Sequence, residues 1–359
     1  MSSEWQTATI GEFAEVKGGK RLPKGKSVQD ERTPYPYLRV TDFGENGLDA
    51  GTVKFIDQEA QAKIARYTIS DADEYISIAG TIEKADIIPP AYSGANLTEN
   101  AAKICDIADQ VDHRFLMYYL RTAEGQAQIS GKTVGTSQPK LALFRIKEIE
   151  VPLPDLPTQR WIAGILSAYD DLIENNLRRI RILEEMAQSL YREWFVHFRF
   201  PGHESVTLVD SPLGPIPEGW EVGRLEDVLV LQRGFDLPKA KRVEGDVPIY
   251  AATGVTGFHV EAKVKAPGVV TGRSGTIGNV NYVQEDFWPL NTALWVKEFP
   301  KSEPLFAFYM LASLDLKQFD SGAAVPTLNR NDIHGLAALI PSRGSQGRFG
   351  TVAGAIHRQ

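Results

Sequence analysis

The stretch that decides the fold runs from Thr158 to Phe198 and reads TQRWIAGILSAYDDLIENNLRRIRILEEMAQSLYREWFVHF. It contains no proline, and no glycine after Gly164, so nothing in it interrupts a helix. Apolar residues recur at heptad spacing, and charged residues occupy the opposite face. The pattern predicts one amphipathic helix of about 40 residues, or roughly 60 Å at 1.5 Å per residue. Pro157 and Pro201-Gly202 are its predicted boundaries.

The apolar face of this helix predicts packing against a partner, as in a coiled coil. Two lines of residues form it: Ile162, Tyr169, Asn176, Leu183 and Leu190 in the first, and Leu166, Ile173, Ile180, Ala187 and Trp194 in the second. A buried amide at Asn176 would fix the register of packing at some cost in stability. A solvent-facing Asn176 is the alternative that the sequence leaves open.

The segments on either side of the helix resemble each other. WQTATIGEFAEVKGGKRLPK, from Trp5 to Lys24, matches WEVGRLEDVLVLQRGFDLPK, from Trp220 to Lys239, at a constant offset of 215 residues. Three later matches keep the same order: Gly80-Thr81-Ile82 with Gly275-Thr276-Ile277, LTENA (97–101) with LNTA (290–293), and Gly131, Val134 and Thr136 with Gly322, Val325 and Thr327 at an offset of 191. This indicates a duplicated domain.

Each copy is rich in short apolar runs that are separated by turn residues, which predicts short strands. Examples are Val269–Thr271, Asn279–Val283 and Ala293–Val296. One helix per copy is expected, at Arg114–Gln128 and Leu305–Phe319. The predicted fold class is therefore α+β, with two repeated mixed α/β domains joined by one long helix. The predicted parts are a first domain (1–155), the long helix (156–200), a second domain (201–340) and the start of a second helical region (341–359).

Composition excludes several classes of protein. Asp plus Glu total 46 against 39 Lys plus Arg, a formal net charge of −7, which gives no general attraction to nucleic acid or membranes. The single cysteine, Cys105, excludes a disulfide framework and fits a reducing compartment. The N-terminus lacks the features of a signal peptide, and the longest apolar stretch, Leu305–Leu314, is too short to span a bilayer. We expect a cytoplasmic protein.

Signals for catalysis are weak throughout the chain. Asp246 with Glu261-Ala262-Lys263 resembles a metal-nuclease pattern, but such short matches arise often by chance. His197 and His203 lack metal-ligand spacing, and no glycine-rich loop for a cofactor phosphate is present. The chain is therefore expected to be no enzyme and to bind neither a metal nor a cofactor.

The cations, in contrast, gather in loops that occur at equivalent places in both copies. Such loops suit contacts with DNA phosphates and base edges, although each residue alone could be a solvated surface charge. The candidate DNA-binding residues of the first domain are Lys17, Lys20, Arg21, Lys24, Lys26, Lys132, Ser137, Gln138 and Lys140. Those of the second domain are Arg233, Lys239, Lys241, Arg242, Arg273, Ser274, Asn329, Arg330 and Asn331.

These residues carry a resemblance to a known family. The run from Val151 to Phe198, with its proline-rich lead, its Gln159 entry and its Trp194-Phe195 exit, resembles the DNA-specificity subunit of type I restriction–modification enzymes. The two domain starts, the turn GRSGTIG (272–278) and VGTSQPKL (134–141) resemble it too. The resemblance implies two target-recognition domains that each read one half of a bipartite DNA target.

The resemblance also implies partners. They are double-stranded DNA, two modification (methyltransferase) subunits that dock on the long helix, and restriction subunits in the assembled complex. S-adenosylmethionine, Mg²⁺ and ATP would be used by those other subunits. The family has a second long helix, and 341–359 resembles only its start, so a truncated distal region is expected.

Other readings of the chain remain open at this point. One is an inactive specificity subunit, or one completed in trans by another chain. A second is a bivalent adaptor that binds protein or carbohydrate, with Trp220, Trp288 and Trp295 available to stack on sugars. Salt-sensitive binding to duplex DNA would distinguish a DNA reader from such an adaptor.

Overall fold

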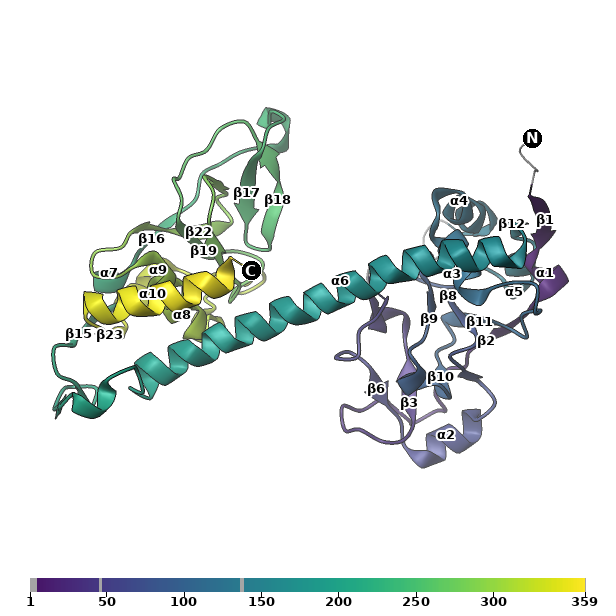
Figure 1. Cartoon of the computed structure of the whole chain (residues 1–359), viewed down its shortest axis with the longest axis horizontal. Helices are drawn as coiled ribbons and strands as arrows, with labels where there is room; N and C mark the ends of the chain where they lie inside the picture. Colours follow the sequence, from purple (N-terminus) through teal and green to yellow (C-terminus); the bar gives the residue numbers. More distant parts are fainter. Residues whose placement is uncertain (1–4, 45–46, 136–138, 359) are drawn as a thin grey trace. The chain divides into compact units, whose positions relative to one another are not determined.

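The computed structural model describes residues 5–44, 47–135 and 139–358, and it separates into two compact units, Met1–Leu177 and Arg178–Gln359. Both units are mixed α/β, as the predicted fold class requires. One uninterrupted helix, α6 (Leu156–Tyr191), begins in the first unit and ends in the second (Figure 1).

Helix α6 confirms the prediction of one long helix between the domains, with 36 residues and a length of about 54 Å. Its boundaries differ from those expected. Pro157 lies inside the first turn, where a missing N–H costs no intrahelical hydrogen bond. The helix ends at Tyr191, and a single π-helical segment, Arg192–Val196, continues the chain.

The first unit contains three main sheets. An antiparallel pair joins β1 to β12, a four-stranded antiparallel sheet has the order β2-β11-β8-β9, and a third sheet has the order β6-β3-β10-β7, in which β3 and β10 are parallel. A short β4-β5 pair is separate. The strands are β1 (Gln6–Thr9), β2 (Glu15–Gly18), β3 (Pro36–Leu38), β4 (Phe43–Gly44), β5 (Gly47–Leu48), β6 (Lys54–Phe55), β7 (Thr68–Ile69), β8 (Glu74–Ser77), β9 (Ala85–Ile87), β10 (Ala95–Leu97), β11 (Ala101–Cys105) and β12 (Glu150–Leu153). The helices are α1 (Ile10–Phe13), α2 (Gln58–Ile64), α3 (His113–Arg121), α4 (Ala123–Lys132) and α5 (Leu143–Lys147).

The second unit repeats this plan. It has an antiparallel β15-β23 pair, a four-stranded antiparallel sheet of order β16-β22-β19-β20, and a sheet of order β18-β17-β21 in which β17 and β21 are parallel. The strands are β13 (Leu208–Val209), β14 (Ile216–Pro217), β15 (Glu221–Arg224), β16 (Val230–Arg233), β17 (Val247–Ala251), β18 (Gly254–His259), β19 (Gly268–Gly272), β20 (Val280–Val283), β21 (Trp288–Pro289), β22 (Ala293–Glu298) and β23 (Ala337–Ile340). The helices are α7 (Leu225–Val228), α8 (Pro304–Ser313), α9 (Arg330–His334) and α10 (Arg343–His357).

Two buried glutamines show how closely the copies correspond. Gln159 near the start of α6 accepts a hydrogen bond from the main-chain N–H of Asp112 at 2.9 Å and donates to the carbonyls of Gln110 and Pro154. Gln346 near the start of α10 accepts from the N–H of Glu303 at 2.8 Å and donates to the carbonyls of Lys301 and Pro341. Each amide thus satisfies three main-chain groups where a helix joins its unit.

Two expectations for the helices are wrong in detail. The predicted helix at Arg114–Gln128 is two helices, because Thr122 adopts an extended conformation and its hydroxyl accepts the N–H of Gly125 to start α4. The predicted helix at Leu305–Phe319 ends at Ser313, and only a short 3₁₀ turn, Leu316–Phe319, follows.

The offset of 191 residues between the later segments is also wrong. In the first unit the main chain of Lys140 bridges Ala79 and Val134. In the second unit the main chain of Thr327 bridges Ser274, and its carbonyl accepts the N–H of Ser321. Lys140 and Thr327 therefore occupy equivalent places. Local identities between glycine, valine and threonine do not fix the pairing, because main-chain hydrogen bonds decide it.

Each unit has its own core, and α6 contributes to both. Ile162 and Ala163 pack on the first core, whereas Ala187 and Tyr191 belong to the second, as does Trp194 of the following π-helical segment. No helix in the described part of the chain is long and apolar enough to span a membrane.

Candidate nucleic-acid interface

Three of the cations predicted for the first domain are neutralised by carboxylates from elsewhere in that unit. Lys17 pairs with Asp106 at 2.7 Å, and Arg21 with Glu99 at 2.5 Å. Lys26 pairs with both Asp57, at 2.8 Å, and Glu59, at 2.6 Å. The hydrogen bond to Asp57 is the largest of the causes that raise the pKa of the Lys26 ammonium group. The segment contains no acid in sequence, but the fold brings acids to it.

The other candidates of the first unit are dispersed. Lys20 and Lys24 are exposed, and the Lys20 ammonium lies 5.8 Å from the centre of the Tyr67 ring. Lys132 ends α4, and Lys140 is exposed beside Ala79. Ser137 and Gln138 lie outside the described residues. None of the described candidates of the first unit lines either of the two hollows described below.

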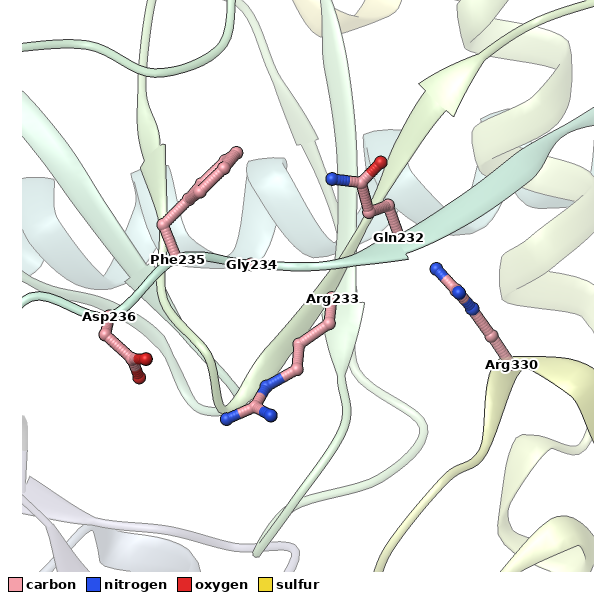
Figure 2. A pocket seen from close by; sticks show the side chains of 6 residues that line it. All are labelled: Gln232, Arg233, Gly234, Phe235, Asp236 and Arg330. Carbon is pink, nitrogen blue, oxygen red and sulfur yellow. The ribbon is translucent and has the colours of Figure 1, made fainter.

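The second unit gathers most of its candidates around two adjoining hollows. The side chains of Arg233, Arg273, Asn329, Arg330 and Asn331 line a hollow of about 460 Å³, together with Leu294, Ser321, Thr327 and Leu328. A neighbouring hollow of about 540 Å³ shares Arg233 and Arg330 with it, and Gln232, Gly234, Phe235 and Asp236 complete its lining (Figure 2).

Local structure explains how these side chains come to line the same hollows. Arg233 is the last residue of β16, Arg273 follows β19 directly, and Arg330 is the first residue of α9. Asn329 precedes α9, and its side-chain oxygen accepts the N–H of Asn331 at 3.1 Å. The chain at Gly234 lies so close to the segment after β21 that a Cβ there would lie 2.2 Å from the carbonyl oxygen of Leu290.

The two hollows carry an excess of positive charge. Within residues 5–44, 47–135 and 139–358, no ion pair joins Arg233, Arg273 or Arg330 to an acid. Arg330 donates to the carbonyl of Leu231 and Arg273 to that of Asn291, both at 3.4 Å. Asp236 is the acid of the lining, and its carboxylate accepts a hydrogen bond from the Asn291 side-chain amide. The remaining guanidinium N–H groups are donors suited to phosphate oxygens or base acceptors.

The remaining second-domain candidates lie outside the linings of these hollows. Lys239 and Lys241 belong to a 3₁₀ turn and are exposed. Arg242 donates to the carbonyl of Thr256 at 3.3 Å, and its Nε is buried. Ser274 forms the main-chain bridge with Thr327.

Sequence reasoning missed several lining residues, namely Gln232, Phe235, Asp236, Ser321 and Thr327. Gln232 and Phe235 flank Arg233-Gly234 in the segment that repeats Trp5–Lys24, so that repeat was the available signal. No local pattern signals that residues 321 and 327 pair with each other, or that Thr327 bridges Ser274 after β19.

The fold also buries a carboxyl group that the sequence does not single out. Glu74 on β8 is fully buried, and Nδ1 of His113 lies 3.6 Å from its Oε1, too far for a hydrogen bond. Burial raises the pKa of Glu74 well above its usual value and lowers the pKa of His113. Both groups are therefore favoured in their neutral forms, and neither lines the hollows described above.

The predicted packing face of α6 has two kinds of environment. Ile162, Ala187, Leu190 and Trp194 pack on the cores of the units, and Leu183 is half-buried. The other members of the face are exposed: Leu166, Tyr169, Ile173, Asn176 and Ile180. Ile165, Leu172, Leu177, Ile182 and Met186 are exposed as well. A run of exposed apolar residues of this size is typical of an interaction surface.

The residues behind the nuclease, metal-binding and sugar-binding alternatives do not come together as a site among the described residues. Lys263 lies 3.5 Å from Glu261 and 4.7 Å from the centre of the Trp288 ring, so the nuclease-like pattern is an exposed ion pair on an aromatic ring. Among the described residues, no group of three His, Cys, Asp or Glu side chains could hold a metal. Trp220 and Trp288 are buried, and Trp295 is half-buried with its ring centre 6.1 Å from that of Phe235.

Comparison with known proteins gives consistent results. The family model described as "Type I restriction modification DNA specificity domain" matches residues 2–185 and 217–348. The MjaIX specificity subunit of a type I restriction enzyme from Methanocaldococcus jannaschii is 35% identical over 243 residues, which cover 67% of this chain and 55% of that protein. The EcoprrI specificity subunit from Escherichia coli is 23% identical over 323 residues, covering 86% of this chain and 76% of the relative.

A solved structure shares the fold. The type I restriction–modification S subunit from M. genitalium superimposes with a TM-score of 0.62 at 17% identity, covering 99% of this chain and 90% of that one. The chain spans about half the length of the M. jannaschii relatives that it matches, 55% of MjaIX and 51% of MjaVIII. Because the family model covers most of both units and most of α6, the chain belongs to the type I restriction–modification DNA specificity family.

Proposed function

We propose that this chain is the sequence-reading, non-catalytic subunit of a type I restriction–modification complex, and that each unit reads one part of a bipartite DNA target. The observation that carries the proposal is the duplication. The two-stranded pair and the four-stranded antiparallel sheet have the same strand order on both sides of one continuous helix, and both units attach to their following helix through an equivalent glutamine. A duplicated reader on one helix suits a target with two specified parts.

Amide and arginine side chains would contact different parts of the DNA. Amide side chains such as Asn329 and Asn331 can pair with adenine in the major groove, and arginines can pair with guanine or with phosphates. In the first unit, Lys20, Lys24 and Lys140 are the exposed candidates for the same contacts.

A selection experiment tests the proposal. The full chain is incubated with a library of randomised duplex DNA, and the bound molecules are sequenced. We expect two short blocks of specified bases with an unspecified spacer of constant length between them. A bound pool with a single block, or with no enriched sequence, would refute two-part reading.

The exposed apolar residues of the predicted packing face of α6, namely Leu166, Tyr169, Ile173 and Ile180, are proposed to dock two modification subunits, which would carry the methyltransferase chemistry. S-adenosylmethionine, Mg²⁺ and ATP, and the restriction subunits, belong to the assembled complex in this proposal. Support comes from the stretch from Ala168 to Ile182, where every side chain of the helix is exposed.

Docking predicts different effects on two faces of α6. Ile173 and Ile182 are both 46% exposed, but at 100° per residue they lie on opposite sides of the helix. I173E should weaken binding of a modification subunit about tenfold or more, since a buried isoleucine contributes about 1.5–3 kcal/mol. I182E, the matched control, should bind within about twofold of the unchanged chain. Co-purification with titrated subunit measures both, and equal effects would contradict docking on the predicted face.

A further inference from the structure

The three arginines that line the two adjoining hollows of the second unit have no charged counterparts in the first. We propose that Arg233, Arg273 and Arg330 bind backbone phosphates of the DNA, and that this clamp of three arginines is a property of the second unit alone. The inference rests on the proposed function. It adds that phosphate is the ligand of this site and that the two units differ in how they contact the DNA backbone.

Main-chain hydrogen bonds identify the counterparts of the three arginines. Arg233 ends β16 as Gly18 ends β2, the equivalent edge strand of the first unit's four-stranded sheet. The N–H of Arg273 donates to the carbonyl of Thr292 at 2.9 Å, as that of Ile78 donates to Asn100 at 2.8 Å.

The next strand segment fixes the third counterpart. Leu328 donates its N–H to the Arg273 carbonyl at 2.8 Å, and Leu141 donates its N–H to the Ile78 carbonyl at 2.9 Å. Two residues further on, Arg330 starts α9 and Leu143 starts α5. The arginines therefore correspond to Gly18, Ile78 and Leu143.

In the first unit these counterparts fill the space with apolar contacts. A Cβ on Gly18 would lie 3.4 Å from a methyl carbon of Leu143, which is ordinary van der Waals contact. Ile78 and Leu143 both pack against the core of that unit. The place where the second unit presents three guanidinium groups is therefore an apolar surface in the first.

The charge of the hollow selects phosphate over a base edge. Guanidinium groups stay protonated at all physiological pH values, so the linings carry three positive charges against the single carboxylate of Asp236. Base edges are neutral and cannot compensate that excess. A phosphodiester is anionic and accepts two parallel hydrogen bonds from one guanidinium.

The donors that remain free are suited to this ligand. Arg273 and Arg330 each donate one Nη group to a main-chain carbonyl, which orients the guanidinium and leaves its other N–H groups available. In Figure 2 the Arg233 side chain projects from its strand on the side away from Phe235. In the first unit, by contrast, Lys17, Arg21 and Lys26 are already paired with acids.

The test measures how the affinity of the full chain for a random-sequence duplex depends on salt. R233Q should weaken binding about tenfold and lower the slope of log K against log salt by about one, as expected for one lost phosphate contact. The base preferences recovered from the randomised library should not change. R233K, which retains the charge, should keep most of the slope.

Two matched variants control for the loss of one positive charge and for its location in the chain. R348Q removes an exposed arginine of α10 that does not line the hollows, and K17Q removes a paired cation of the first unit. Both should leave the slope within about 0.3 of the original value, because neither loses a phosphate contact. Thermal unfolding of each variant confirms that the second unit is intact.

Two results would overturn the clamp while leaving the proposed function in place. One is a change of base preference in R233Q with an unchanged salt slope, which would assign the arginine to a base. The other is an equal loss of slope in K17Q and R233Q, which would distribute the phosphate contacts over both units. If the unchanged chain binds no duplex in a salt-sensitive manner, the proposed function fails, and the clamp fails with it.

Discussion

Replacing Gly234 by alanine is expected to destabilise the second unit by about 4 kcal/mol or more, which is a large part of the stability of a typical domain. The added Cβ would lie 2.2 Å from the carbonyl oxygen of Leu290 and 2.5 Å from that of Pro289. Both are main-chain atoms, at the end of β21 and directly after it, so no side chain can move aside. Urea unfolding followed by near-ultraviolet circular dichroism measures the change.

The first unit offers a matched variant and α6 a control. G19A should destabilise the first unit by a similar amount, because its Cβ would lie 2.0 Å from the carbonyl oxygen of Thr98. G164A introduces its Cβ into open space on a helix and should be neutral or stabilising by up to about 1 kcal/mol. If G234A unfolds at the same urea concentration as the unchanged chain, the close approach of the two segments is refuted.

Inserting seven residues of helical sequence after Arg181 is expected to lengthen the unread spacer of the target by about three base pairs. Two helical turns add about 10.5 Å at 1.5 Å per residue, and successive base pairs are about 3.4 Å apart. Seven residues also restore the orientation of the following helix to within about 20°. The insertion point is exposed, so no core is disturbed.

The measurement is the same selection from randomised duplexes, with sequencing of the bound pool. The two blocks of specified bases should stay the same, because neither unit is changed. A control that replaces residues 175–181 by seven other helix-forming residues should leave the spacer as it was. A spacer of unchanged length in the insertion variant would show that α6 does not set the separation.

The long helix and the duplication are predictable because their signals are local. A heptad pattern without glycine or proline requires only sequence neighbours, and a repeat is visible in the alignment of two segments. The ends of helices are harder to predict from the sequence. Thr122 interrupts the predicted helix of the first domain because its hydroxyl caps a new helix, an alternative that the apolar pattern does not reveal.

The candidate site is only partly predictable, for a tertiary reason. Lys17 and Arg21 belong to a segment without acids, yet Asp106 and Glu99 reach them from 89 and 78 residues away. A cation cluster in sequence therefore does not establish free charge in the fold. In the second unit, dispersed cations form a site. Arg233, Arg273 and Arg330 come from three distant segments, line one hollow and form no ion pair with an acid among the described residues.

The equivalent glutamines have a consequence for how such chains can change. Gln159 and Gln346 attach each unit to its helix through one side chain and main-chain groups, so the attachment makes few demands on the identity of neighbouring side chains. The sequences of loops elsewhere in a unit can then diverge while the hydrogen bonds around the glutamine keep their geometry. A domain of different target preference can in principle be grafted onto the same helix at this point.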